Sequence, residues 1–250
     1  MEIAGSSPAY HTQLKIIMKL PFEEIYLVNL VERPDKYETM RNRIEYMGWD
    51  VKDFRVVKHP ISEKFVLEYD IDSFRMCSGN EINCAREQYT IIKSAYLRGI
   101  ETVAIMEDDI SFYKDMSVWE EYFKNLPDDW DILRINALRG RYEYYFFEDC
   151  NDFWKRQRDF SGLFGAGFYV MNRKAMKYII DSMDKIYKPI DVILAEYVGS
   201  DINIYIPNIP LSLCLEDSFN SDIRGEINKE WNTFHTNYKE IPTFKKEDYI

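Results

Sequence analysis

Hydrophobic positions along the first half of the chain alternate between short continuous apolar runs and longer stretches with helical spacing. Residues 25–30 form a nearly continuous apolar run, which is typical of a strand covered on both faces. Pro34 and Asp35 suit the first turn of a helix, and Gly48 is expected to end it. Residues 51–57 alternate enough to predict a second strand.

The next helix and strand lead to the most informative stretch of the chain. Ser78-Gly79-Asn80-Glu81 fits a capping box, and apolar residues then recur at helical spacing until Gly99. Residues 103–106 form an apolar strand that ends abruptly in three carboxylates, Glu107-Asp108-Asp109. The order strand-helix-strand-helix-strand predicts an α/β fold with a central mixed, mostly parallel sheet flanked by helices.

Downstream, residues 130–135 are expected to form another strand, whereas residues 139–160 lack a clear period and are expected to form a long exposed loop. Residues 162–171 place small residues before an apolar strand, and Asn172 is a good N-cap for a helix that reaches about Asp184. The glycines form neither a dinucleotide-binding GxGxxG sequence nor a phosphate-binding GxxxxGK[ST] loop.

Composition narrows the class of protein. The 250 residues, 46% of them hydrophobic, can fill the core of a single globular domain. A net charge of −11 argues against nucleic acid as the partner, because phosphate binding uses clustered Lys and Arg. Four cysteines without a CxxC pair argue against a zinc site or a disulfide scaffold: Cys77, Cys84, Cys150 and Cys214.

The expected domain organisation has three parts. Residues 1–20 are expected to be a loosely held arm, residues 21–225 the α/β domain, and residues 226–250 a C-terminal extension that packs on or over the active site. The longest apolar runs fall short of the roughly 18 residues that a membrane-spanning helix needs, and the chain starts without the apolar core of a secretory signal. We therefore expect a cytoplasmic protein with no transmembrane segment.

The triplet Glu107-Asp108-Asp109 predicts a cation at the end of its strand. Adjacent carboxylates repel one another and are costly to desolvate, so at the mouth of a buried strand they need a metal ion, a lysine or an arginine. The carboxyl ends of strands are also where ligands bind in open α/β sheets. A solvated acidic turn is the alternative that the triplet alone leaves open.

Several segments, in order, resemble glycosyltransferase family 25, which includes lipopolysaccharide-modifying sugar transferases and collagen galactosyltransferases. The resemblance covers roughly residues 24–224. The segments that carry it are Ile25-Tyr26-Leu27-Val28-Asn29-Leu30 with Arg33-Pro34-Asp35, Glu81-Ile82-Asn83-Cys84, Ile105-Met106-Glu107-Asp108-Asp109-Ile110, Trp130-Asp131-Ile132-Leu133, Gly165-Ala166-Gly167-Phe168-Tyr169-Val170, Pro189-Ile190-Asp191 and Ser221-Asp222-Ile223.

The resemblance implies a GT-A-like single domain that moves a sugar from a nucleotide-sugar, a UDP-sugar in first place, to a glycan or other hydroxyl acceptor, with inversion. It also implies a divalent metal, Mn²⁺ before Mg²⁺, whose hard oxygen ligands suit carboxylates. Asp109 is the first candidate ligand, followed by Glu107, which is also suited to the ribose. Asp108 is the weakest candidate for the metal and is expected to orient the donor, with Asn29 and Arg33 as further donor contacts and Lys36 beside them.

An inverting transfer needs a carboxylate that takes the proton of the acceptor hydroxyl. Asp191 is the candidate base, with a helix N-cap as its alternative role. Asp222 is the competing candidate, as base or second metal ligand, and Glu216 and Asp217 lie close enough in sequence to serve instead. Two further groups have possible roles: His235 near the metal, and the aromatic residues 142–147 with Trp154 against an acceptor sugar.

Departures from the family pattern leave a second function open. Family members carry Ser-His shortly after a Gly-Cys pair, whereas this chain has Glu87 and Gln88, and Asn83 replaces the glycine. A catalytically weak or inactive nucleotide- or carbohydrate-binding relative therefore remains the alternative. A phosphohydrolase of the haloacid-dehalogenase type is excluded, because its Asp-x-Asp-x-Thr/Val pattern is absent after Met106. The donor sugar, the acceptor and the linkage do not follow from the sequence.

Overall fold

The structure is a computed structural model, and it describes residues 19–59, 68–70, 75–77, 79–136, 147–158, 166–182, 189–196, 201–214 and 246–250. The described strands are β1 (Glu24–Leu30), β2 (Phe54–His59), β3 (Glu68–Asp70), β4 (Arg75–Cys77), β5 (Thr102–Glu107), β6 (Ile110–Phe112), β7 (Ile132–Arg134), β8 (Phe147–Asp149), β9 (Trp154–Gln157), β10 (Phe168–Asn172), β11 (Ile204–Pro207) and β12 (Ser212–Cys214). The described α-helices are α1 (Pro34–Tyr46), α2 (Gly79–Arg98), α3 (Met116–Lys124), α4 (Arg173–Ser182) and α5 (Ile190–Glu196).

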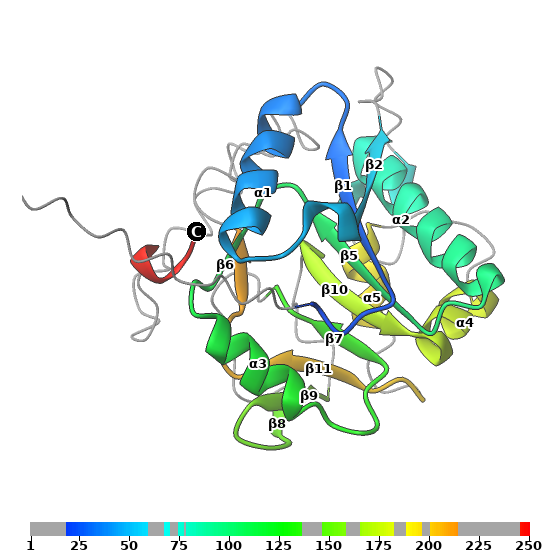
Figure 1. The fold of residues 1–250 in the computed structure, drawn as a ribbon. Coiled ribbons are helices and arrows are strands. Elements are labelled where there is room, and N and C mark those ends of the chain that lie inside the picture. The colour runs from blue at the N-terminus through cyan, green and yellow to red at the C-terminus, as the bar shows by residue number, and fades with distance from the viewer. Residues whose placement is uncertain are drawn as a thin grey trace, which may run out of the picture.

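A mixed sheet forms the centre of the molecule (Figure 1). Within the described residues it has eight strands in the order β2-β1-β5-β10-β7-β11-β9-β8. Six of these strands run in one direction, and only β10 and β9 run against them. The predicted α/β class, with a mixed and mostly parallel sheet flanked by helices, is confirmed.

Local signals set the ends of the helices. Pro34 occupies the first turn of α1, and Gly48 follows the helix with φ +77°, a left-handed conformation that glycine adopts at little cost. Gly99 follows α2 in the same way, with φ +85°. The Asn172 side-chain oxygen accepts a hydrogen bond from the Ala175 N–H at 2.9 Å, so the predicted N-cap of α4 is confirmed.

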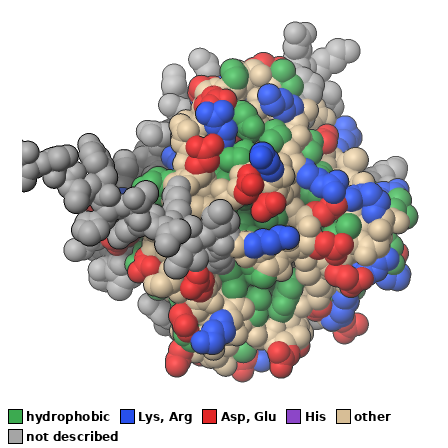
Figure 2. Space-filling view, viewed as in Figure 1, with side chains coloured by type: hydrophobic (Ala, Val, Ile, Leu, Met, Phe, Trp, Pro, Cys, Tyr) green, Lys and Arg blue, Asp and Glu red, His purple; other side chains and the backbone are tan. Residues whose placement is uncertain are grey.

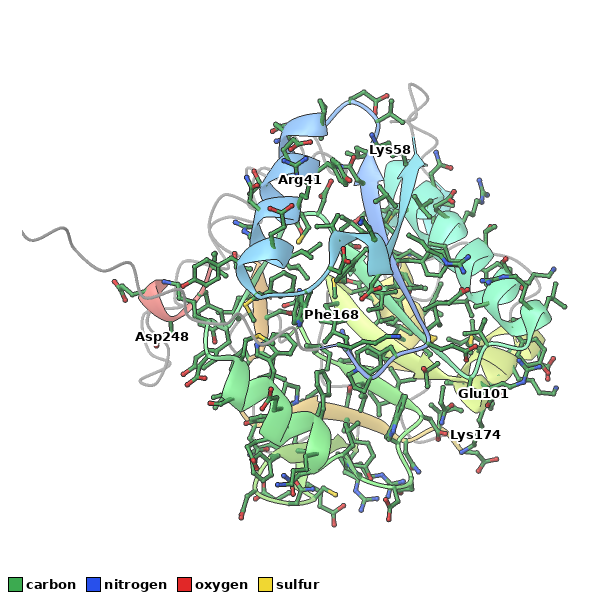
Figure 3. All side chains as sticks on the ribbon, in the orientation of Figure 1. Arg41, Lys58, Glu101, Phe168, Lys174 and Asp248 are labelled. Atoms are coloured by element: carbon green, nitrogen blue, oxygen red, sulfur yellow. The ribbon has the colours of Figure 1, made fainter. Side chains whose placement is uncertain are left out.

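Two hydrophobic layers enclose the sheet. Alternate residues of each strand point to opposite faces, so Leu27, Met106 and Phe168 pack in one core layer with α1 and α3. Val28 and Ile105 pack in the other layer with α2, α4 and α5. Figure 3 shows the labelled Phe168 in the interior, whereas the labelled Arg41, Lys58 and Asp248 lie at the periphery.

The chain between residues 139 and 160 differs from its prediction. Residues 147–157 form the antiparallel hairpin β8–β9, which extends the central sheet, in place of the expected loop. Trp154 is buried and donates from its indole N–H to the Tyr122 carbonyl oxygen at 2.9 Å, so it packs in the core and does not face an acceptor. Residues 142–146, the other aromatic candidates, lie outside the described residues.

The hydrophobic core begins slightly before the predicted start of the domain. Leu20, placed in the predicted arm, is 3% exposed and packs in the first core layer, while residues 1–18 lie outside the described residues. None of the described helices is both long enough and apolar enough to cross a lipid bilayer. In the view of Figure 2, acidic and basic side chains are interspersed over the described surface.

Candidate active site

The carboxyl ends of β1, β5 and β7 bring polar side chains together at one edge of the sheet, with β10 between β5 and β7. β1 pairs with β5 so that Val28 lies opposite Glu107, and β10 pairs with β7 so that Tyr169 lies opposite Arg134. β10 runs against its neighbours, so its first residues meet the carboxyl ends of β5 and β7. The predicted triplet therefore lies at the edge where α/β sheets bind ligands.

Asp108 lies on the side of the sheet that faces α1. It forms the turn between β5 and β6 with Asp109, and the Asn29 side-chain amide donates to its Oδ2 at 2.5 Å. The same amide donates to the Arg33 carbonyl oxygen at 3.0 Å, while Asn29 Oδ1 is buried without a hydrogen-bond partner. Asn29 thus ties Asp108 to the β1–α1 turn and keeps one acceptor for a further donor group.

Glu107 lies on the opposite side, against α2. Gln88 Nε2 donates to Glu107 Oε1 at 3.1 Å, and Cys84 Sγ lies 3.9 Å from the same oxygen. The Tyr169 hydroxyl donates in turn to Gln88 Oε1 at 2.7 Å. One carboxylate oxygen of Glu107 is therefore held by two protein donors from α2.

Burial and electrostatic repulsion both act on the carboxylates of this edge. Burial, followed by repulsion from Asp109, Asp108 and Asp191, raises the pKa of Glu107 to about 8. Burial also raises the pKa of Asp108 to about 6, although the hydrogen bond from Asn29 and the charge of Lys36 oppose that rise. Burial raises the pKa of the Cys84 thiol, which is therefore a neutral donor. Carboxylates that hinder one another's ionisation create a demand for a cation.

Asp191 and Arg134 complete the cluster on the α2 side. Asp191 lies in the first turn of α5, is 6% exposed, and accepts the Val192 N–H at 2.9 Å. Its charge raises the pKa of Glu107, so the two carboxylates act on each other across the site. Arg134 is 3% exposed, and burial lowers its pKa to about 10 against the opposing charge of Asp191. Asp191 therefore combines a local backbone contact with a place in the charged cluster.

The donor set fits a divalent cation in part. Asp109 is half-buried at the turn that follows β5, and it raises the pKa of both other carboxylates of the triplet. Within the described part of the chain, no three His, Cys, Asp or Glu side chains are grouped closely enough to hold a metal by themselves. Carboxylate oxygens are hard ligands that suit Mn²⁺ or Mg²⁺, and such an ion would need further ligands besides these side chains.

The other predicted site residues lie at the start of α1 or outside the described residues. The Arg33 guanidinium pairs with the Asp35 carboxylate at 2.7 Å, at the start of α1, while Lys36 is the basic residue of this turn whose charge lowers the pKa of Asp108. The remaining candidates lie outside the described residues: Asp222, Glu216, Asp217 and His235.

β6, the strand that directly follows Asp109, contacts distant parts of the chain. β6 starts at Ile110, whose carbonyl oxygen accepts from Arg43 Nη1 at 2.7 Å. β6 also pairs with β12 and exchanges two backbone hydrogen bonds, each 2.9 Å, between Phe112 and Ile250. The final residues of the predicted C-terminal extension are therefore held against β6, whereas residues 226–245 lie outside the described residues.

Four buried residues of the site were not singled out as functional from the sequence: Cys84, Gln88, Arg134 and Tyr169. Two signals pointed to them. Cys84 and Gln88 are four residues apart on the apolar face of α2, and Arg134 is a single charge inside an apolar strand. A polar residue on a buried face needs a partner, so these signals could have placed Cys84, Gln88 and Arg134 among the candidates.

Comparison with known proteins adds the family. The model of "Glycosyltransferase family 25 (LPS biosynthesis protein)" matches residues 22–194. A glycosyltransferase 25 family member of Aedes aegypti is 31% identical over 141 residues, which are 48% of this chain and 22% of that protein. Procollagen galactosyltransferase 1-B of Xenopus laevis is 27% identical over 146 residues, 50% of this chain and 23% of that protein. The chain thus spans about a quarter of the length of these relatives or less.

A third relative, the probable inactive glycosyltransferase 25 family member 3 of Bos taurus, is 25% identical over 133 residues, 47% of this chain and 22% of that protein. Among solved structures, the galactosyltransferase LgtC in complex with donor and acceptor sugar analogs aligns with 11% identity and a TM-score of 0.39, covering 88% of this chain and 98% of that chain. With the family model matched over most of the described sheet and the carboxylate triplet at its carboxyl edge, the chain belongs to glycosyltransferase family 25.

Proposed function

We propose that this chain is a glycosyltransferase that moves a sugar from a nucleotide-sugar, a UDP-sugar in first place, to a hydroxyl of a glycan acceptor. Family membership supports the class of reaction. The observation that carries the proposal is the cluster of four carboxylates at one sheet edge, in which Asp108, Asp109 and Asp191 all raise the pKa of Glu107. Such repulsion is relieved when a cation and its phosphate ligand occupy the site.

Asp109, with Glu107 beside it, would hold a divalent metal, for which Mn²⁺ is the first choice and Mg²⁺ the second. When bound, the metal supplies positive charge to the diphosphate that leaves the sugar. Asp109, in the turn between β5 and β6, is the first candidate of the two. Glu107 Oε1 already accepts from Gln88.

Side chains on the α1 side of the edge would orient the donor. Asp108, held by Asn29 at 2.5 Å, and the free acceptor Asn29 Oδ1 can hydrogen-bond donor hydroxyl or N–H groups. The charge of Lys36 lowers the pKa of Asp108. Lys36 is a better candidate for a phosphate contact than Arg33, whose guanidinium pairs with Asp35. This arrangement supports a donor site that runs from the β1–α1 turn to Asp109.

Asp191 remains our candidate base for an inverting transfer, in which the carboxylate takes the acceptor proton as the hydroxyl attacks the sugar carbon. Its carboxylate lies on the α2 side of the cluster, and its charge acts on Glu107 and on buried Arg134. Asp222, the competing base or second metal ligand, stays a sequence-based proposal.

A thermal-shift screen of nucleotides and nucleotide-sugars, with and without Mn²⁺, tests the proposal. We expect a uridine diphosphate compound to raise the Tm only when Mn²⁺ is present, and Asp109→Asn to remove that rise. Tyr205→Phe is the control, because Tyr205 lies on β11, away from the triplet, and its hydroxyl donates to Asp129. Failure of every nucleotide to shift the wild-type Tm would contradict the proposal.

A catalytically inactive relative is the second candidate. The departure at Glu87-Gln88 and the match to a relative named as probably inactive favour it. Such a protein would bind the nucleotide-sugar with Mn²⁺ but release no nucleoside diphosphate with any acceptor. Binding and turnover must therefore be measured on the same preparation.

A further inference from the structure

A buried chain of hydrogen bonds connects β10 to the triplet through α2. Gln88 is 0% exposed and Tyr169 is 1% exposed. Tyr169 donates to Gln88 Oε1 at 2.7 Å, while Gln88 Nε2 lies 3.1 Å from Glu107 Oε1 and 3.3 Å from Cys84 Sγ. The amide thereby uses its oxygen and both of its N–H groups inside the protein.

The partners of this amide fix its orientation. A flipped Gln88 would set its carbonyl oxygen against the Glu107 carboxylate, so two acceptors would face each other in a buried site, which is costly. With Oε1 held by the Tyr169 hydroxyl, the N–H groups must point at Glu107 and Cys84. Glu107 therefore selects the orientation of Gln88, and the Tyr169 hydroxyl holds the amide in it by donating to Oε1.

These contacts make the two carboxylate oxygens of Glu107 unequal. Oε1 accepts from Gln88 Nε2 at 3.1 Å and lies 3.9 Å from Cys84 Sγ. An oxygen with two protein donors has little capacity left for a ligand. Glu107 can therefore present only Oε2 to whatever binds at the edge.

We propose that Gln88 is a positioning residue for donor binding: it turns Glu107 so that a single carboxylate oxygen, Oε2, faces the nucleotide-sugar and its metal, and Tyr169 acts only by orienting Gln88. The proposal rests on the function proposed above and assigns a role to the position at which the family resemblance leads one to expect histidine. Groups that orient a metal-site ligand from behind affect affinity without touching the ligand bound there.

Titration of UDP in the presence of Mn²⁺ by isothermal calorimetry tests the proposal with three variants. Gln88→Met removes the amide at similar volume and is expected to weaken UDP binding by roughly 10- to 100-fold. Tyr169→Phe is expected to weaken it less, by about threefold to tenfold, because Gln88 can still donate to Glu107. The double variant should bind as Gln88→Met alone does, because the hydrogen bond of Tyr169 reaches Glu107 through Gln88.

Matched controls separate positioning from loss of stability. Gln157→Met removes a buried amide from β9, which is separated from β5 by the three strands β10, β7 and β11. Tyr205→Phe removes a hydroxyl from β11. Both controls should lower the Tm without changing the affinity for UDP. A folded Gln88→Met variant with wild-type affinity would overturn the proposal, and so would a Tyr169→Phe effect that is retained in full in the Gln88→Met background.

A readout that needs no ligand keeps this proposal distinct from the proposed function. The side-chain amide protons of Gln88, followed by ¹⁵N NMR, should exchange slowly with water and shift in both Tyr169→Phe and Glu107→Gln. Rapid exchange in the wild type would refute the hydrogen-bond chain. Protected Gln88 protons in a wild-type protein that fails to bind UDP with Mn²⁺ would support the chain and refute the proposed function.

Discussion

Replacing Glu107 with glutamine should stabilise the metal-free protein at high pH. The substitution keeps the size of the side chain and an oxygen that can accept from Gln88 Nε2, but it removes a charge that lies among Asp108, Asp109 and Asp191. Burial and these neighbours raise the pKa of Glu107 from 4.5 to about 8. At about 1.4 kcal/mol per pKa unit, full ionisation of Glu107 costs the folded state at most about 5 kcal/mol.

The sign of the pH dependence follows from proton binding. Between pH 4.5 and about 8 the folded protein keeps a proton on Glu107 that the unfolded chain has lost, so the free energy of unfolding falls as the pH rises through that window. The Glu107→Gln variant lacks this contribution. We therefore expect the two proteins to differ little near pH 5 and the variant to be more stable near pH 8.

Urea unfolding in EDTA, at pH 5 and at pH 8, measures the effect. Because neighbouring groups and water relax around a new charge, we expect a difference of about 2–4 kcal/mol in the unfolding free energy at pH 8, below the upper value of about 5 kcal/mol. Glu247→Gln serves as a control for loss of one exposed carboxylate. The reasoning fails if Glu107→Gln is no more stable than the wild type at pH 8, or if its advantage is the same at both pH values.

Three further substitutions test the framework around the site. Gly167→Ala should cost about 1–3 kcal/mol in the free energy of unfolding, since its Cβ would lie 2.2 Å from Asn136 Nδ2 and 2.7 Å from Ile110 Cγ2; wild-type stability in urea would contradict the crowding. Asn29→Ala should cost about 1–3 kcal/mol at pH 8, because Asp108 loses the amide that donates to it at 2.5 Å, and an unchanged Tm would argue against that contact. Arg98→Met should cost about 1–2 kcal/mol in the free energy of unfolding at neutral pH, with Arg55 still paired to the Glu24 carboxylate. The cost should be smaller in acid, because the hydrogen bonds from Arg98 lower the pKa of buried Glu24. UDP binding should be unchanged, because Arg98 and Glu24 lie at the opposite edge of the sheet, and a tenfold weaker affinity would argue against that separation.

Features that depend on neighbouring residues in the sequence were predicted well. The end of α1 at Gly48, the N-cap at Asn172 and the strand that leads to Glu107 each follow from a local conformational preference or a period of apolar residues. Asn29 and Asp108, 79 residues apart, were predicted to share the site because the family pattern places both near the donor. Their direct hydrogen bond required the register of β1 against β5.

Features that depend on packing between distant elements could not be predicted from these patterns. The contact between Tyr169 and Gln88 spans 81 residues and requires the register of β10 against β5 together with the rotation of α2. The β8–β9 hairpin was missed because its strands carry many polar residues at a sheet edge, where only one face is covered. Arg134 lies in a strand of three residues, too short for its burial to be read from periodicity.

The central claim is that the carboxylate edge of this family 25 chain binds and uses a nucleotide-sugar. The most direct test measures release of UDP from a panel of UDP-sugars with Mn²⁺, with and without glycan acceptors, for the wild type and for Asp109→Asn. The account predicts Mn²⁺-dependent release by the wild type and loss of at least about 100-fold in the variant, whose far-UV circular dichroism stays native. Equal release by wild type and Asp109→Asn, or binding of UDP-sugars without release under any condition, would contradict it.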